Sequence, residues 1–120
     1  MADARSEFRC LLGGKTIRRS SFDPHQTLLD FLRLEARLTG TKEGCAEGDC
    51  GACTVLLGRL RNGTVQFDPV NACIVPLGSV DSTQILTVEH LADVETHPVQ
   101  QAMAREHGSQ CGFCTPGIVM

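Results

Sequence analysis

The sequence has no excess of positive charge and no long hydrophobic run. Its 120 residues include 11 lysines and arginines against 14 aspartates and glutamates, a formal net charge of −3. Without a basic surface, the attraction that drives binding to a phosphate backbone is missing, which excludes nucleic-acid binding. No stretch approaches the roughly 18 apolar residues of a membrane span, and charged residues precede the first apolar run. We therefore expect a cytoplasmic protein that has neither an export signal nor a membrane segment.

Cysteine and glycine, in contrast, are abundant, with 7 and 12 residues respectively. A chain of this length buries roughly two-thirds of the surface that its unfolded form exposes, so its core does not depend on disulfides. In a chain without an export signal, cysteines are kept reduced. The cysteines therefore indicate metal binding or redox chemistry.

Hydrophobic patterns up to Val88 predict a small mixed sheet with one helix packed on it. Gly13-Gly14 and Asn62-Gly63 are typical of tight hairpin turns. Thr27 is expected to cap a helix, because Asp30 follows it three residues later in a capping-box arrangement. The predicted elements are a hairpin of 7–12 and 15–22, an amphipathic helix over 28–38 that stops near Gly40, a loop over 41–53, and strands over 54–60, 64–67 and 84–88.

The pattern changes after Val88, because residues 89–120 carry no strand signal. His97-Pro98 opens a predicted helix that ends near Gly108, and Thr115-Pro116 is typical of the start of another. We therefore divide the chain into a mixed α+β domain over residues 1–88 and the start of a helical domain over residues 89–120.

Four cysteines have the spacing of an iron–sulfur site. Cys45, Cys50 and Cys53 follow the pattern C-x4-C-x2-C, and Cys73 comes after the second predicted hairpin. This is the spacing of plant-type [2Fe–2S] ferredoxins, in which four thiolates hold two irons. Folding of the sheet would bring Cys73 to the loop, so the fold and the cluster are expected to be coupled.

Glycines alternate with the loop cysteines. Gly44, Gly48 and Gly51 would allow positive φ angles and a close approach of the backbone to a compact inorganic core. The acidic residues Glu47 and Asp49 flank the same loop. They would either disfavour the more negative reduced cluster or act only as solvated charges.

Other uses account for fewer of the cysteines. A zinc site combining Cys50 and Cys53 with Cys111 and Cys114 has an unusual spacing and would leave Cys45 and Cys73 idle. The pair Cys111 and Cys114 also fits a redox-active dithiol, although no βαβ pattern surrounds it. Cys10 alternates with apolar neighbours in a predicted strand and is expected to be a buried core residue.

Longer motifs extend this interpretation to a family. The segments KEGCAEGDCGACTV (42–55), VNAC (70–73), HPVQ (97–100) and HGSQCGFCTPGIVM (107–120) resemble the iron–sulfur subunit of xanthine dehydrogenases. These belong to the molybdenum hydroxylases, with aldehyde oxidases and carbon monoxide dehydrogenase. The HGSQCGFC motif is most similar to the xanthine dehydrogenase branch, and Ala46 with Asp49 resembles its bacterial members.

The resemblance implies a β-grasp, ferredoxin-like domain followed by the start of an all-α [2Fe–2S] domain. Cys45, Cys50, Cys53 and Cys73 match the ligands of the first cluster. Cys111 and Cys114 match half of the ligands of a second, whose other pair, a Cys-x-Cys motif, is absent from this sequence. Gln110 matches a position that approaches the molybdopterin cofactor in relatives.

In such enzymes, electrons from the molybdenum centre pass through the helical-domain cluster and then the β-grasp cluster to FAD and NAD⁺. The resemblance thus implies an electron-transfer component of an oxidoreductase of purine catabolism, with an FAD-binding domain and a molybdenum-binding subunit as partners. The substrate chemistry would lie elsewhere, and the four histidines, at 25, 90, 97 and 107, are paired with no nucleophile. The alternatives are the iron–sulfur subunit of another molybdenum hydroxylase, of the aldehyde oxidase or carbon monoxide dehydrogenase type, a free-standing ferredoxin, and a zinc-binding interaction module.

Overall fold

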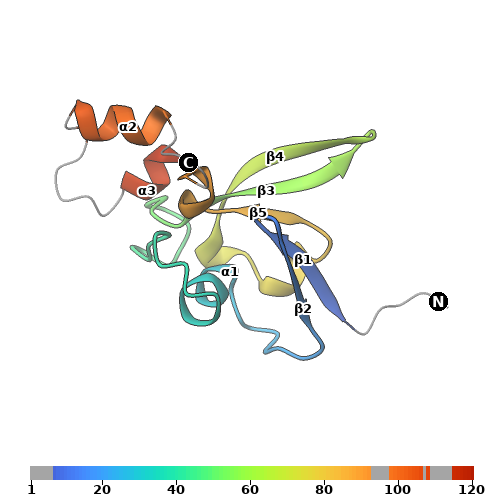
Figure 1. Ribbon diagram of the computed structural model, residues 1–120. Coiled ribbons are helices and arrows are strands. Elements are labelled where there is room, and N and C mark those ends of the chain that lie inside the picture. Colours follow the sequence, from blue (N-terminus) through green and yellow to red (C-terminus); the bar gives the residue numbers. More distant parts are fainter. Residues whose placement is uncertain (1–6, 93–97, 107, 109–114) are drawn as a thin grey trace.

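The protein is built around a five-stranded mixed sheet (Figure 1). The computed structural model describes residues 7–92, 98–106, 108 and 115–120. The strand order is β2-β1-β5-β3-β4; β1 and β5 are parallel, and the other neighbours are antiparallel. The strands are β1 (Phe8–Leu12), β2 (Lys15–Arg19), β3 (Thr54–Arg61), β4 (Thr64–Asn71) and β5 (Gln84–Leu86).

Both predicted hairpins are present, and their turns have the expected chemistry. Asn62 and Gly63 have φ angles of 52° and 78°, the left-handed pair that a two-residue turn between twisted strands requires. The strand after this turn is longer than predicted, because it continues past Phe67 to Asn71. Pro69 interrupts the sequence pattern but not the strand, since β4 lies at the edge of the sheet, where a missing N–H is tolerated.

The predicted helix begins where expected but ends early. Thr27 caps it, with its side-chain oxygen accepting the N–H of Asp30 at 3.1 Å. The helix consists of α1 (Leu28–Asp30) and the π-helical segment η1 (Phe31–Glu35). The extension towards Gly40 was wrong, because Arg37 adopts a left-handed φ of 61° and turns the chain back.

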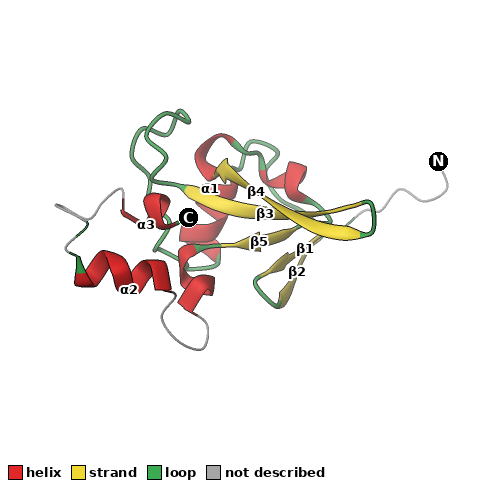
Figure 2. Cartoon of the chain, turned by 90° about the horizontal axis from the view of Figure 1, so that it is seen from above, coloured by secondary structure: helices red, strands yellow, loops and turns green. Residues whose placement is uncertain are grey.

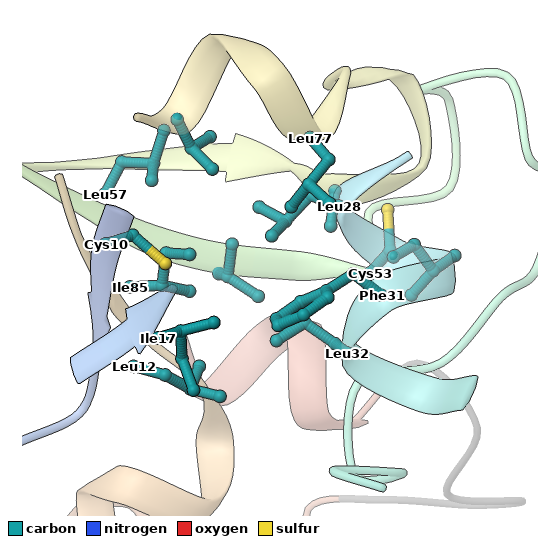
Figure 3. Close-up of a cluster of buried hydrophobic side chains, with 14 of the residues drawn as sticks. Cys10, Leu12, Ile17, Leu28, Phe31, Leu32, Cys53, Leu57, Leu77 and Ile85 are labelled. Atoms are coloured by element: carbon teal, nitrogen blue, oxygen red, sulfur yellow. The ribbon is translucent and has the colours of Figure 1, made fainter. Parts of the chain in front are cut away.

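One face of the sheet packs against this helix to form the core (Figure 3). Leu28, Phe31 and Leu32 are fully buried beside Ile85 of β5. Cys10 lies in the same cluster with 4% of its surface exposed, as predicted for a core residue. Burial and the nearby Asp81 raise the pKa of its thiol to about 11, so Cys10 remains protonated at neutral pH.

Short helices complete the chain, and several predicted boundaries shift; strand β2, for example, ends at Arg19 instead of Phe22. Strand β5 ends at Leu86 instead of Val88, because buried Thr87 binds Glu89 and His90 through its side chain rather than extending the ladder. The helix α3 already includes Thr115, which was predicted as its cap. The 3₁₀ segments η2 (Ala72–Ile74), η3 (Leu77–Val80) and η4 (Val88–Ala92) precede α2 (Pro98–Arg105) and α3 (Thr115–Val119).

Helices α2 and α3 lie together at the end of the sheet where β3 begins (Figure 2). None of the helices in the described part of the chain has the length and hydropathy that crossing a membrane requires.

Candidate metal centre

The antiparallel pairing of β3 with β4 brings Cys73 to the loop that carries the other cysteines. Thr54, the first residue of β3, is opposite Asn71, the last residue of β4. Cys53 and Cys73 flank this pair, and the N–H of Cys73 donates to Cys53 Sγ at 3.4 Å. Because the register of the hairpin fixes this approach, the folded sheet itself joins the two sequence-distant cysteines.

The loop over residues 41–53 wraps around the sulfur of Cys45. Backbone N–H groups of Glu47, Asp49 and Cys50 donate to Cys45 Sγ at 3.4, 3.2 and 3.2 Å. Cys50 Sγ in turn accepts the N–H groups of Cys45 and Ala52, both at 3.4 Å. The loop therefore directs its amide dipoles inward, towards sulfur.

Two of the three loop glycines have the predicted conformation. Gly48 and Gly51 have φ angles of 80° and 75°, whereas Gly44 is not among the residues with positive φ. The third left-handed position belongs to Ala46, with a φ of 57°. This turn directly precedes Glu47, whose N–H reaches Cys45 Sγ, so the wrap begins one residue after the first cysteine rather than before it.

Hydrogen bonds to loop carbonyls fix the wrap against the sheet. The side-chain N–H of Asn71 donates to the carbonyl of Gly48 at 3.0 Å, which links the end of β4 to the centre of the loop. The carbonyl of Gly51 accepts both the N–H and the hydroxyl of Thr54, at 3.1 and 2.6 Å. Sequence reasoning gave Asn71 no role, although its place two residues before Cys73 was a signal.

The four cysteines divide into two pairs with different environments. Cys45 and Cys50 lie at the outer edge of the loop, where Cys50 is exposed and each sulfur accepts the backbone N–H of the other residue. Cys53 and Cys73 lie at the edge of the core, with 2% and 9% of their surfaces exposed, and are joined by the N–H of Cys73 donating to Cys53 Sγ. The site thus extends from buried to exposed sulfur.

Local dipoles and burial shift the pKa values of two of these thiols in opposite directions. The N–H groups of Cys50, Glu47 and Asp49 lower the pKa of Cys45 to about 7. Burial and the hydrogen bond with Cys53 raise the pKa of Cys73 to about 11. Cys73 therefore needs a positive partner if it is to become a thiolate, and bound metal provides one.

This donor set fits an iron–sulfur cluster. Neutral thiols are weak acceptors, whereas thiolates bound to iron carry negative charge that N–H groups stabilise. Six backbone N–H groups already point at three of the four cysteine sulfurs. Within the described ranges, no three or more His, Cys, Asp or Glu side chains converge as they would around one metal ion.

The remaining predicted site residues have no described geometry. Cys111, Cys114 and Gln110 lie outside the described residues, as do His97 and His107. Of the other histidines, His25 is exposed, and His90 accepts the N–H of Thr87 through Nδ1 at 2.8 Å. His90 thus holds the turn after β5 in place.

Comparison with known families agrees with the site. Residues 14–78 match the 2Fe-2S iron-sulfur cluster binding domain, and residues 87–120 match a second family, the [2Fe-2S] binding domain. The chain belongs to the 2Fe-2S iron–sulfur cluster binding domain family, here followed by the second [2Fe–2S] binding domain. The predicted ferredoxin-like fold and its helical continuation are confirmed.

Similar proteins include large oxidoreductases. The chain is 48% identical to a xanthine dehydrogenase of Drosophila pseudoobscura pseudoobscura and 45% identical to aldehyde oxidase 1 of Macaca fascicularis, covering 96% and 98% of this chain. It spans 9% of the length of each. Among solved structures, a chain of quinoline 2-oxidoreductase from Pseudomonas putida 86 superposes with a TM-score of 0.79 at 33% identity, over 94% of this chain and 65% of that one. The predicted relationship to the iron–sulfur region of xanthine dehydrogenases and related oxidoreductases is therefore confirmed.

Proposed function

We propose that Cys45, Cys50, Cys53 and Cys73 hold one [2Fe–2S] cluster, with Cys45 and Cys50 on one iron and Cys53 and Cys73 on the other. The observation that carries this proposal is the pairing of Cys45 with Cys50 and of Cys53 with Cys73 at a loop where backbone N–H groups point at three of the four sulfurs. Two irons that share four thiolates need two pairs, whereas a structural zinc ion needs all four ligands around one centre.

The chain supplies half of a second site. In this proposal, Cys111 and Cys114 are two ligands of another [2Fe–2S] cluster in a helical domain that begins near residue 89, and the other two ligands come from further chain. Gly44, Gly48 and Gly51 belong to the cradle of the first cluster. From its match to the motif of relatives, we propose Gln110 as the residue of this segment that approaches molybdopterin in the assembled enzyme.

The bound clusters would supply one-electron transfer, and the chain would serve as a relay. We place it in a cytoplasmic molybdenum hydroxylase, where electrons from substrate oxidation pass through it to an FAD-binding domain and then to NAD⁺. Both xanthine dehydrogenases and aldehyde oxidases match the chain closely, so the proposal extends to the family and not to one substrate.

The residues of the chain tune and insulate the relay. The pair at Cys53 and Cys73 is closed off by the core, whereas the pair at Cys45 and Cys50 lies near the surface. Exchange with a partner is therefore expected at the outer edge. The inward N–H groups offset part of the negative charge that reduction adds, and exposed Glu47 and Asp49 oppose it.

Metal and sulfide analysis tests the proposal. We expect two irons and two acid-labile sulfides per 120-residue chain, a visible absorption band and an electron paramagnetic resonance (EPR) signal on reduction, with Cys111 and Cys114 titrating as free thiols. One zinc and no sulfide would reject the cluster. Co-purification with a molybdenum-containing partner separates this role from that of a free-standing ferredoxin, which would remain alone.

Replacement of Asn71 by aspartate is expected to weaken the hold on the first cluster. The new carboxylate cannot donate to the carbonyl of Gly48 and places two acceptors at hydrogen-bonding distance. We expect several-fold faster bleaching of the visible band by a chelator. Asn62→Asp adds the same charge in a hairpin turn that accepts either residue and should bleach at the wild-type rate. Equal rates for Asn71→Asp and Asn62→Asp would show that the hydrogen bond from Asn71 to Gly48 does not help to hold the cluster.

A further inference from the structure

Helix α3, which follows Cys111 and Cys114 in the sequence, lies directly on the loop that binds the first cluster. Gly117 is the third residue of α3, and a β-carbon built on it would collide with the carbonyl oxygen of Gly51 and lie 3.2 Å from the α-carbon of Ala52. These are backbone atoms, so they cannot rotate away as a side chain would. Only glycine allows the two segments to approach this closely.

Gly51 is itself a fixed part of the first site. It lies between Cys50 and Cys53, and its carbonyl is held by both the N–H and the hydroxyl of Thr54. The next peptide N–H, that of Ala52, donates to Cys50 Sγ at 3.4 Å. The route from the sulfur of Cys50 to the surface of α3 thus consists of one hydrogen bond, one peptide unit and one van der Waals contact.

The other end of this route leads to the second site. Cys114 precedes Gly117 by three residues, so their α-carbons are at most about 11 Å apart in any trans chain. We infer that the contact between Gly51 and Gly117 is the inter-cluster junction: Gly117 is a positioning residue that sets the separation of the two iron–sulfur sites and hence the rate of electron transfer between them. This inference rests on the proposed function.

A methyl group at position 117 would have to separate the two segments. Alanine has a higher helix propensity than glycine by about 1 kcal/mol, so Gly117→Ala would favour α3 if only the helix mattered. Because the obstacle is backbone, α3 must move away from the loop instead. Tunnelling rates fall exponentially with distance, and magnetic coupling between two reduced clusters also weakens as they separate.

The first test uses Gly117→Ala in the full-length enzyme, with Gly14→Ala as the matched control, because a β-carbon at Gly14 meets nothing within 4 Å. We expect unchanged iron content, a smaller spin–spin splitting between the reduced clusters in EPR spectra, and a several-fold slower reduction of the first cluster through the second. Gly14→Ala should match the wild type. Wild-type splitting and rate in Gly117→Ala would overturn the inference.

The second test needs no substitution. The wild-type 120-residue chain is loaded with the first cluster alone, and that cluster is reduced. Paramagnetic relaxation of the Gly117 amide should then be much faster than that of the Gly63 amide. Gly63 lies in the turn after β3, so the eight residues of that strand, about 25 Å, separate it from Cys53. Equal relaxation in a chain with a normal EPR signal would overturn the junction alone. The absence of any cluster signal would instead overturn the proposed function on which it rests.

Discussion

Replacement of Cys50 by serine is expected to abolish or severely perturb the visible absorption of the first cluster. Serine has an alcohol whose deprotonation is far less favourable than that of a thiol, so one iron would keep only Cys45 as a good ligand. The change also weakens the acceptor for the N–H groups of Cys45 and Ala52. Iron and sulfide content per chain, with the visible and EPR spectra, measures the loss.

Cys10→Ala is the control for this experiment, because it also removes one thiol. Cys10 lies on β1, where its buried side chain alternates with those of Phe8 and Leu12, and it is not part of the cysteine loop. We expect an unchanged spectrum and a decrease of about 1 kcal/mol in the free energy of unfolding, from the lost packing of one sulfur atom. If Cys10→Ala bleached the protein and Cys50→Ser did not, the ligand assignment would be wrong.

The sequence predicted the parts of this site that depend on residue type, and missed those that depend on the path of the backbone. The spacing of the cysteines and the hairpin turn at Asn62-Gly63 were sufficient to predict that Cys73 would meet the loop, because antiparallel pairing follows from the turn. The left-handed conformation of Ala46 was not predictable in the same way. It depends on the N–H groups that converge on Cys45, a constraint that exists only after the loop has closed.

Other differences also arise from tertiary context. Leu34 and Leu38 continue the apolar pattern and therefore predict a helix over 28–38, yet Leu34 is 69% exposed in the structure. The left-handed turn at Arg37 releases the chain towards Thr41, whose carbonyl, like that of Thr39, is held by the guanidinium of Arg33. Ending the helix early is thus what delivers the cysteine loop to the edge of the sheet.

Replacement of Gly48 by valine is expected to prevent stable assembly of the first cluster. Gly48 has a φ of 80°, which is about 1–2 kcal/mol unfavourable for an L-residue and worse for a β-branched one. A β-carbon there would also lie 2.8 Å from Cδ1 of Ile74. A shift of this residue moves the carbonyl that Asn71 holds and the following N–H groups that reach Cys45. We expect a large loss of iron per folded chain after reconstitution.

Gly63→Val separates the loss of the cluster from backbone strain in general. Gly63 has nearly the same φ, 78°, but a β-carbon there meets nothing within 4 Å. Gly63→Val should cost comparable stability in the hairpin and leave two irons per folded chain.

Combining Gly48→Val with Ile74→Ala then distinguishes the two causes at Gly48, because removal of the long side chain relieves the contact and leaves φ unchanged. Recovery of iron would assign the loss to Ile74, and continued loss would assign it to the left-handed backbone. A normal cluster in Gly48→Val itself would show that the wrap does not need this conformation.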